Sequence, residues 1–366
     1  MSEDFKPEMK KRITIKEIAD LAGVNISTVS RALNPETASW ISEAQREKIM
    51  AICDRLNYRP RLAAKGCATG KSFRVALILG AITWDLSSPL FALYIRGMCS
   101  VLQREGYTLS VLWAEEDPEK RDEVVRNFLM SEIADGYILG VPLLAPQTID
   151  PFRDSGHPIL SLGSVGQASL ENFSTVEIDP SSTFTNIWKI IPEELMKNML
   201  YIGPDTRATQ AKWKMFSSCS GGKAAPEKLF YPVENGKVPF HYDYFCARNG
   251  LRQHTRRMLK SRLICCASDL VAYAVCEELA ERGRRVGEDI YVLGYDNLEN
   301  DTPCPDRKPF LSTIDPHWEY AGRKSAELIL DAVRHPQKSA PLKTVISGTY
   351  IRRRSFPFDL PGEGRI

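Results

Sequence analysis

Apolar residues recur at helical spacing near the N-terminus, and this pattern predicts two short helices joined by a tight turn. Thr14 can cap the first helix, and Glu17, three residues later, completes a Thr-x-x-Glu capping box. Gly23 supplies the positive φ that a sharp exit from a helix needs. Asn25 and Ser27 can cap a second helix. The expected buried positions of both helices are Ile15, Ile18, Ala19, Ala22, Val29, Ala32 and Leu33.

A loop and a third helix follow this pair. We expect the loop from Pro35 to Trp40, and Ser42 with Gln45 forms a second capping box at the start of the third helix. The apolar stripe of that helix is Ile49, Ile52, Cys53 and Leu56. Three short amphipathic helices predict a small closed core. The tight turn between the first two is typical of a helix-turn-helix, whose second helix enters the major groove of DNA.

From Phe73 onward, short apolar runs alternate with amphipathic helical segments. In a first half the expected strands are 74–79, 107–113, 136–139 and 158–162, with helices at 89–104 and 120–131. The rhythm restarts after about residue 176, with strands at 199–203, 228–232, 263–267 and 290–294 and helices at 181–196, 209–217, 243–260 and 270–282. This alternation predicts an α/β core of doubly wound parallel sheets with helices on both faces.

Composition narrows the class of protein. A chain of 366 residues that is 43% hydrophobic and 26% charged is expected to be a soluble globular protein of two or three domains. It has no apolar run of about 18 residues, and its first dozen residues are charged, so we expect no membrane span, no signal peptide and a cytoplasmic location. The nine cysteines are scattered except for Cys265-Cys266. No spacing suits a metal, and we expect neither a metal nor a cofactor.

Charge is distributed unevenly along the chain. The first 71 residues contain 13 lysines and arginines against 9 aspartates and glutamates, although the whole chain has a net charge of only +2. A basic N-terminal segment followed by a near-neutral remainder is typical of a protein in which only the N-terminal domain contacts the phosphates of a nucleic acid. The outward side of the second helix has matching chemistry, because Arg31 carries a fork that can bind guanine bidentately. We expect bases to be read by Ile26, Ser27 and Arg31, and phosphates to be held by Thr14, Lys16, Thr28, Ser30 and Asn34.

The run ITIKEIADLAGVNISTVSRALN, followed by Asn57-Tyr58-Arg59-Pro60, resembles the DNA-binding domain of the LacI/GalR family of repressors. The resemblance extends to Arg352-Arg353-Arg354-Ser355. It implies a helix-turn-helix domain over 1–58, a hinge over 59–71, a two-lobed core similar to periplasmic binding proteins over 72–355, and a tail over 356–366. The expected N-lobe comprises about 72–175 and 304–333, and the C-lobe about 176–303 and 334–355. The loop after the second helix is about two residues longer than is usual in the family.

In the family, the hinge orders on the operator and enters the minor groove. The resemblance assigns this role to Arg61, Leu62, Lys65 and Cys67. Cys67 stands where relatives usually have leucine, and Gly66 before it disfavours a helix. We therefore expect a shallower DNA bend, or Leu62 in the wedging role. A plain flexible linker is the alternative.

Ligands of doubly wound sheets bind at the carboxyl ends of the strands. Asp296 follows one expected strand and can accept hydrogens from sugar hydroxyls or from a nucleobase. Arg207 follows another and can donate to ligand oxygens. In the family both positions contact the effector. Asp269 follows a third strand and can instead be a helix cap. The expected effector-binding residues are Leu90, Phe91, Arg207, Thr209, Phe240, Ser268, Asp269 and Asp296.

The sequence thus predicts a sequence-specific transcriptional regulator, a repressor, with double-stranded DNA and a small molecule as partners. The DNA partner is expected to be a pseudo-palindromic operator bound by a homodimer. A sugar or sugar derivative between the lobes is the expected effector, with a nucleobase corepressor as the alternative. A sugar-binding protein without a DNA role and an enzyme on the same core are rivals. Gly-x-Ser-x-Gly, His-Glu-x-x-His and Walker motifs do not occur, so we expect no catalytic residue.

Overall fold

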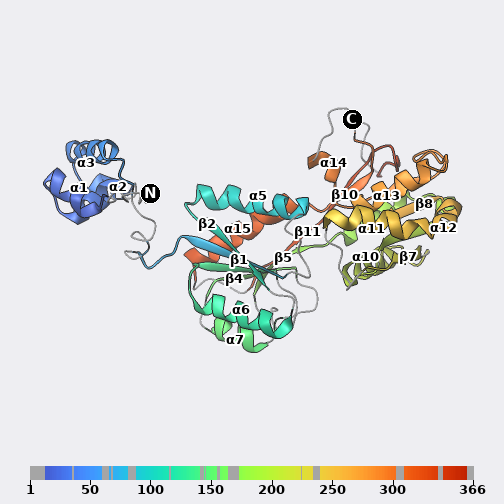
Figure 1. Ribbon diagram of the computed structural model, residues 1–366, viewed down its shortest axis with the longest axis horizontal. Helices are drawn as coiled ribbons and strands as arrows, with labels where there is room; N and C mark the ends of the chain where they lie inside the picture. Colours follow the sequence, from blue (N-terminus) through green and yellow to red (C-terminus); the bar gives the residue numbers. More distant parts are fainter. Residues whose placement is uncertain are drawn as a thin grey trace, which may run out of the picture. The chain divides into compact units, whose positions relative to one another are not determined.

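The computed structural model divides the chain into two compact units, Met1–Phe73 and Arg74–Ile366 (Figure 1). The residues it describes are 13–34, 37–59, 66, 69–80, 88–114, 117–140, 144, 146–154, 157–163, 173–223, 225–233, 240–301, 309–336 and 341–360. Within these residues, no helix has the length and apolar character to cross a membrane.

The N-terminal unit contains α1 (Ile15–Ala22), α2 (Ile26–Leu33), the 3-10 helix η1 (Ala38–Trp40) and α3 (Glu43–Arg55). The capping box of Thr14 and Glu17 is formed, and Gly23 has a φ of 70°. Side chains of all three α-helices meet in one core, in which Ile18, Val29 and Ile49 are fully buried. The predicted three-helix core is confirmed. The second capping box is wrong, because the Ser42 hydroxyl makes no capping hydrogen bond.

In the second unit, a six-stranded sheet has the order β11-β5-β4-β3-β1-β2, with all neighbours parallel. Its strands are β1 (Arg74–Gly80), β2 (Thr108–Ala114), β3 (Gly136–Gly140), β4 (Ile159–Leu162), β5 (Ser174–Ile178) and β11 (Lys343–Ile346). Helices α5 (Pro89–Arg104) and α15 (Trp318–Arg334) lie on one face, and α6 (Pro118–Met130) and α7 (Pro146–Asp154) lie on the other (Figure 1). We call this sheet with its helices the first lobe.

Helices α5 and α15 touch backbone to backbone. A Cβ added at Gly97 would lie 2.0 Å from the carbonyl oxygen of Glu319, and one added at Gly322 would lie 2.0 Å from that of Tyr94. Glycine is therefore required on both sides of the crossing. This contact fixes α15, which comes late in the chain, to the first lobe, as predicted.

The second lobe is built on a parallel sheet of order β7-β6-β8-β9. Its strands are β6 (Met199–Pro204), β7 (Glu227–Tyr231), β8 (Leu263–Cys266) and β9 (Tyr291–Leu293). Two short strands, β10 (Thr313–Asp315) and β12 (Thr349–Ile351), pair antiparallel beside it. The helices are α8 (Ser181–Ile190), α9 (Glu193–Met196), α10 (Arg207–Ser218), α11 (Phe240–Arg252), α12 (Thr255–Lys260), α13 (Asp269–Ala280) and α14 (Leu298–Asp301). The sheet separates two apolar clusters, one with α11 and α13 and one with α8 and α10.

The predicted lobe boundaries are wrong in two places. Strand β11 pairs with β5, so 343–346 belongs to the first lobe, which also includes all of β5 beyond residue 175. Residues just before α15 belong instead to the second lobe, because the amides of Gly294 and Asp296 donate to the carbonyls of Ser312 and Ile314. The errors have one cause: an apolar run does not reveal which of two similar parallel sheets it will join.

Candidate DNA-binding surface and effector site

The exposed side of α2 is organised by Asn25, its N-cap residue. The Asn25 Oδ1 accepts hydrogen bonds from the Thr28 amide at 2.9 Å and from the hydroxyls of Ser27 and Thr28, each at 2.7 Å. Each hydroxyl has one proton, so Ser27 and Thr28 must rotate before they can donate to DNA. Ile26, Ser30 and Arg31 are exposed on the same helix.

The remaining residues expected to contact DNA differ in exposure and in the hydrogen bonds they make. Thr14 donates both its amide and its hydroxyl hydrogens to Glu17, and Lys16 is exposed on α1. Asn34 is the half-buried C-cap residue of α2. Their phosphate contacts stay predictions. The expected hinge residues Arg61, Leu62, Lys65 and Cys67 lie outside the described residues.

Trp40 is a neighbour of Arg31 to which the sequence pattern alone assigns no role. The Arg31 guanidinium carbon lies 5.9 Å from the centroid of the Trp40 ring, and the Trp40 side chain is 69% exposed. The one sequence feature that points to a role for Trp40 is its place in a polar loop. A large aromatic residue there is not explained by burial in the core.

Four of the expected effector-binding residues gather at the carboxyl end of the second sheet. Asp296 lies in the loop after β9, and Ser268 and Asp269 begin α13 after β8. Thr209 is in the first turn of α10, where its amide donates to the Thr206 hydroxyl. A Cβ added at Gly203 would meet both Thr209 and Ala267, which places Thr209 beside the end of β8.

The other four are less defined. Arg207 and Phe240 are the first residues of α10 and α11, and their side chains lie outside the described set. Leu90 and Phe91 lie in the first turn of α5 in the first lobe, and both side chains are half-buried. Their contacts with an effector stay predictions.

The loop of Asp296 has an unusual backbone. Asp296 has a φ of 119° and Asn297 a φ of 57°, so two successive non-glycine residues lie in the positive-φ region. Such conformations cost free energy and persist only where surrounding contacts hold them. The Asp296 side chain is 5% exposed, and its amide donates to the Ile314 carbonyl at 2.8 Å.

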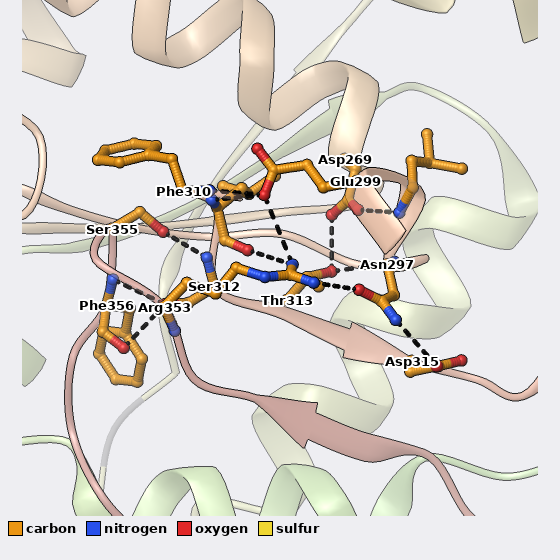
Figure 2. A network of polar contacts seen from close by, with 12 residues as sticks. Asp269, Asn297, Glu299, Phe310, Ser312, Thr313, Asp315, Arg353, Ser355 and Phe356 are labelled. Atoms are coloured by element: carbon orange, nitrogen blue, oxygen red, sulfur yellow. Dashed lines mark hydrogen bonds and ion pairs between the residues drawn. The ribbon is translucent and has the colours of Figure 1, made fainter. Parts of the chain in front are cut away.

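The contacts that hold this loop are centred on Asn297 (Figure 2). Its Oδ1 accepts a hydrogen bond from Arg353 at 2.7 Å, and its Nδ2 donates to Asp315 at 3.0 Å. Its amide donates to the Thr313 hydroxyl at 3.3 Å. Arg353 also donates to the Leu311 carbonyl at 2.7 Å. The loop is therefore bonded to β10 and to the segment after β12.

Asp269 is part of the same support. It is fully buried, its Oδ1 accepts from the Thr313 hydroxyl at 2.6 Å, and its Oδ2 accepts from the Leu298 amide at 2.8 Å. Burial raises the pKa of Asp269 to about 6, while the bonds from Thr313 and Leu298 act in the opposite direction. The arrangement favours the alternative interpretation, in which Asp269 is a structural carboxylate and not a ligand contact. Ser268 is the N-cap of α13 and accepts from the Val271 amide.

Lys212 adds a cation that the sequence pattern does not predict. It lies on α10 three residues after Thr209, and therefore on the same side of the helix. Its ammonium group donates to the Ala267 carbonyl at 2.8 Å and lies 3.7 Å from the centroid of the Tyr295 ring. A small, partly open pocket of about 10 Å³ lies beside it. Lys212 thus brings a positive charge next to the Asp296 loop.

Comparison with known proteins matches both parts of this architecture. A model of bacterial regulatory proteins of the lacI family matches residues 14–61, and a periplasmic binding protein-like domain matches 225–356. Residues 14–61 therefore form a helix-turn-helix domain of the lacI family, and the second match falls on the two-sheet core. Members of this family are regulators and not enzymes.

Similar LacI/GalR relatives cover almost the whole chain. The ribose operon repressor of Bacillus subtilis is 25% identical over 346 residues, which are 93% of this chain and 98% of that protein. The transcriptional regulator CelR of Thermobifida fusca is 27% identical over 358 residues, 95% of this chain and 99% of that one. The transcriptional repressor PurR of Photobacterium profundum is 25% identical over 334 residues, which are 88% of this chain and 92% of that protein.

Solved structures show the same fold. The lac repressor dimer bound to operator and the anti-inducer ONPF has a TM-score of 0.69 at 21% identity, covering 95% of this chain and all of that one. A CelR–cellobiose complex has a TM-score of 0.60 at 21% identity, covering 94% of this chain and all of that one. The predicted fold class, a helix-turn-helix domain followed by a periplasmic-binding-protein-like core, is confirmed.

Proposed function

We propose that the protein is a cytoplasmic repressor that binds a pseudo-palindromic operator as a homodimer and releases or tightens it when a sugar or sugar derivative binds between its lobes. One observation carries the proposal. A single chain joins an exposed helix-turn-helix reading helix to a two-sheet core with an acidic loop at the carboxyl end of its second sheet.

The DNA-binding part of the proposal rests on α2. Arg31 reads guanine through its fork, and Ile26 and Ser27 contact neighbouring base edges. Phosphate contacts come from Thr14, Lys16, Thr28, Ser30 and Asn34. A single reading helix covers only a few base pairs, so two copies related by a two-fold axis are needed for a specific site.

The effector part rests on the Asp296 loop. Its carboxylate can accept two hydroxyl hydrogens of one sugar ring, while Arg207 and Lys212 supply donors for ring and hydroxyl oxygens. Ribose or cellobiose is named for several relatives and solved structures, which supports a sugar. A nucleobase is the second candidate, because the same carboxylate can accept hydrogens from ring and exocyclic nitrogens.

The test begins with selection of bound sequences from random double-stranded DNA by the full chain. We expect enrichment of a pseudo-palindrome. Operator binding is then measured with ribose, cellobiose, other mono- and disaccharides and a panel of nucleobases. We expect one sugar to change operator affinity, and calorimetry to give its Kd. A nucleobase acting alone would favour the second candidate, and a chain that enriches no sequence would contradict the proposal.

A further inference from the structure

Trp40 has the largest exposed fraction among the described large apolar side chains. Isolated exposed apolar residues are common and need no explanation by themselves. What distinguishes Trp40 is its neighbour, since the guanidinium carbon of Arg31, the residue proposed to read guanine, lies over the indole ring at 5.9 Å from its centroid.

The loop holds Trp40 in a fixed place relative to α2. The Thr37 amide donates to the Asn34 carbonyl at 3.1 Å, and the Thr37 hydroxyl donates to the Arg31 carbonyl at 3.3 Å. The Trp40 amide in turn donates to the Thr37 carbonyl at 3.0 Å. On the other side, Ile41 packs against the core of the three helices. Trp40 is therefore anchored on both sides by backbone bonds and packing.

Stacking on an indole and reading a base use different parts of a guanidinium. The planar cation is attracted to the ring through its face, while its N–H groups point outward in its own plane. Those in-plane groups are the donors of a bidentate contact with guanine O6 and N7. The ring therefore limits the orientations of the Arg31 fork before DNA arrives, and less conformational freedom is lost on binding.

We propose that Trp40 is a positioning residue for base recognition, and that its indole orients Arg31 so that guanine is preferred at one operator position. This inference rests on the proposed function, because it requires α2 to read DNA. It predicts that the identity of residue 40 changes the selectivity at that position and leaves the other positions of the operator unchanged.

The test is sequence selection from random double-stranded DNA with the full chain. The proteins compared are the wild type, Trp40→Ala, Trp40→Phe, Arg31→Ala and the Trp40→Ala/Arg31→Ala double variant. Met130→Ala is a matched control, since Met130 is 65% exposed but lies in the other unit. Thermal unfolding confirms that each variant is folded. Trp40→Phe, which keeps an aromatic face, serves if the alanine variant does not fold.

We expect Trp40→Ala to lower the preference for guanine at the Arg31 position about two- to five-fold, the factor expected from an exposed cation–π contact. Trp40→Phe should keep most of the preference, and Met130→Ala should keep all of it. In the Arg31→Ala background, Trp40→Ala should have no further effect, because the two residues act as one unit.

Three results would overturn the inference or its basis. An unchanged guanine preference in Trp40→Ala removes Trp40 from base recognition. A uniform loss of affinity, or a further loss in the Arg31→Ala background, would mean that Trp40 contacts DNA itself and does not position Arg31. If the wild-type chain enriches no sequence, the proposed function itself is contradicted. This outcome differs from the first two, in which the wild type still selects an operator.

Discussion

At the scale of single residues, Arg31 is the side chain on which sequence-specific binding depends most. Arg31→Ala should cost about 1–3 kcal/mol on the selected operator and relax one base position, because a bidentate contact is lost. Affinities of the wild type and the variant for operators substituted at each position measure this. An equal loss on every sequence, with selectivity intact, would show that Arg31 only anchors a phosphate.

Asp269 gives a second residue-scale prediction, concerning pH. Its folded pKa of about 6 is above the ordinary aspartate value of 3.8, so between these values the folded state binds more protons than the unfolded state. The Asp269 contribution to the free energy of unfolding therefore falls as pH rises from about 4 to 6, and is constant above. The total change is on the order of 3 kcal/mol.

Urea unfolding of the wild type and Asp269→Asn between pH 4 and 7 measures this effect. Asparagine can still accept from Leu298 and donate to Thr313, so the variant should fold. The stability of Asp269→Asn relative to the wild type should rise with pH over that window. Asp205→Asn, at an exposed aspartate, is the control. A wild-type-to-variant difference that does not depend on pH would contradict the burial argument.

Residue-scale features were predictable from sequence where they are local. Thr14, Glu17 and Gly23 act within one helix, and spacing alone identified them. Trp40 and Lys212 instead contact residues that are nine and 55 positions away in the sequence, Arg31 and Ala267. The pattern of residues along the chain does not reveal which distant side chains will be in contact. The same holds for Asp269, whose burial follows from how β10 and α14 close over it.

At the scale of elements, the close crossing of α5 and α15 predicts the sign of the stability change caused by a glycine-to-alanine substitution. Alanine in a helix is ordinarily more stable than glycine by about 1 kcal/mol. Gly322→Ala should instead destabilise the protein by roughly 1–3 kcal/mol, because the new methyl group would meet the Tyr94 carbonyl and force the helices apart. Urea unfolding measures the difference. A stabilised variant would show that the crossing has room for a side chain.

Periodicity predicted most helices and strands, and its failures have physical reasons. Helix α7 was not predicted, because Pro151 lies inside it and proline removes a helical hydrogen bond. Strands β10 and β11 were assigned to the wrong lobes, since pairing partners are set by tertiary contacts. The short β5 was not recognised as a separate strand. Elements were thus more predictable than their partners.

At the scale of the whole molecule, the proposed function joins operator binding and effector binding in one chain. An effector can change operator affinity only if it binds one arrangement of the protein better than another, and the coupling must be reciprocal. The Asp296 loop is bonded through Asn297 to Asp315, which immediately precedes the passage of the chain back into α15 of the first lobe. A ligand that shifts this loop therefore acts on a segment that connects the lobes.

The most direct test of this central claim is operator affinity of the wild type and Asp296→Asn, measured with and without the sugar identified by calorimetry. We expect the sugar to shift the operator affinity of the wild type. Asp296→Asn should weaken sugar binding by about 1–3 kcal/mol, the cost of disturbing a buried polar pair, and leave operator affinity without sugar unchanged. An Asp296→Asn variant that keeps its affinity for the sugar but loses the operator would contradict the account.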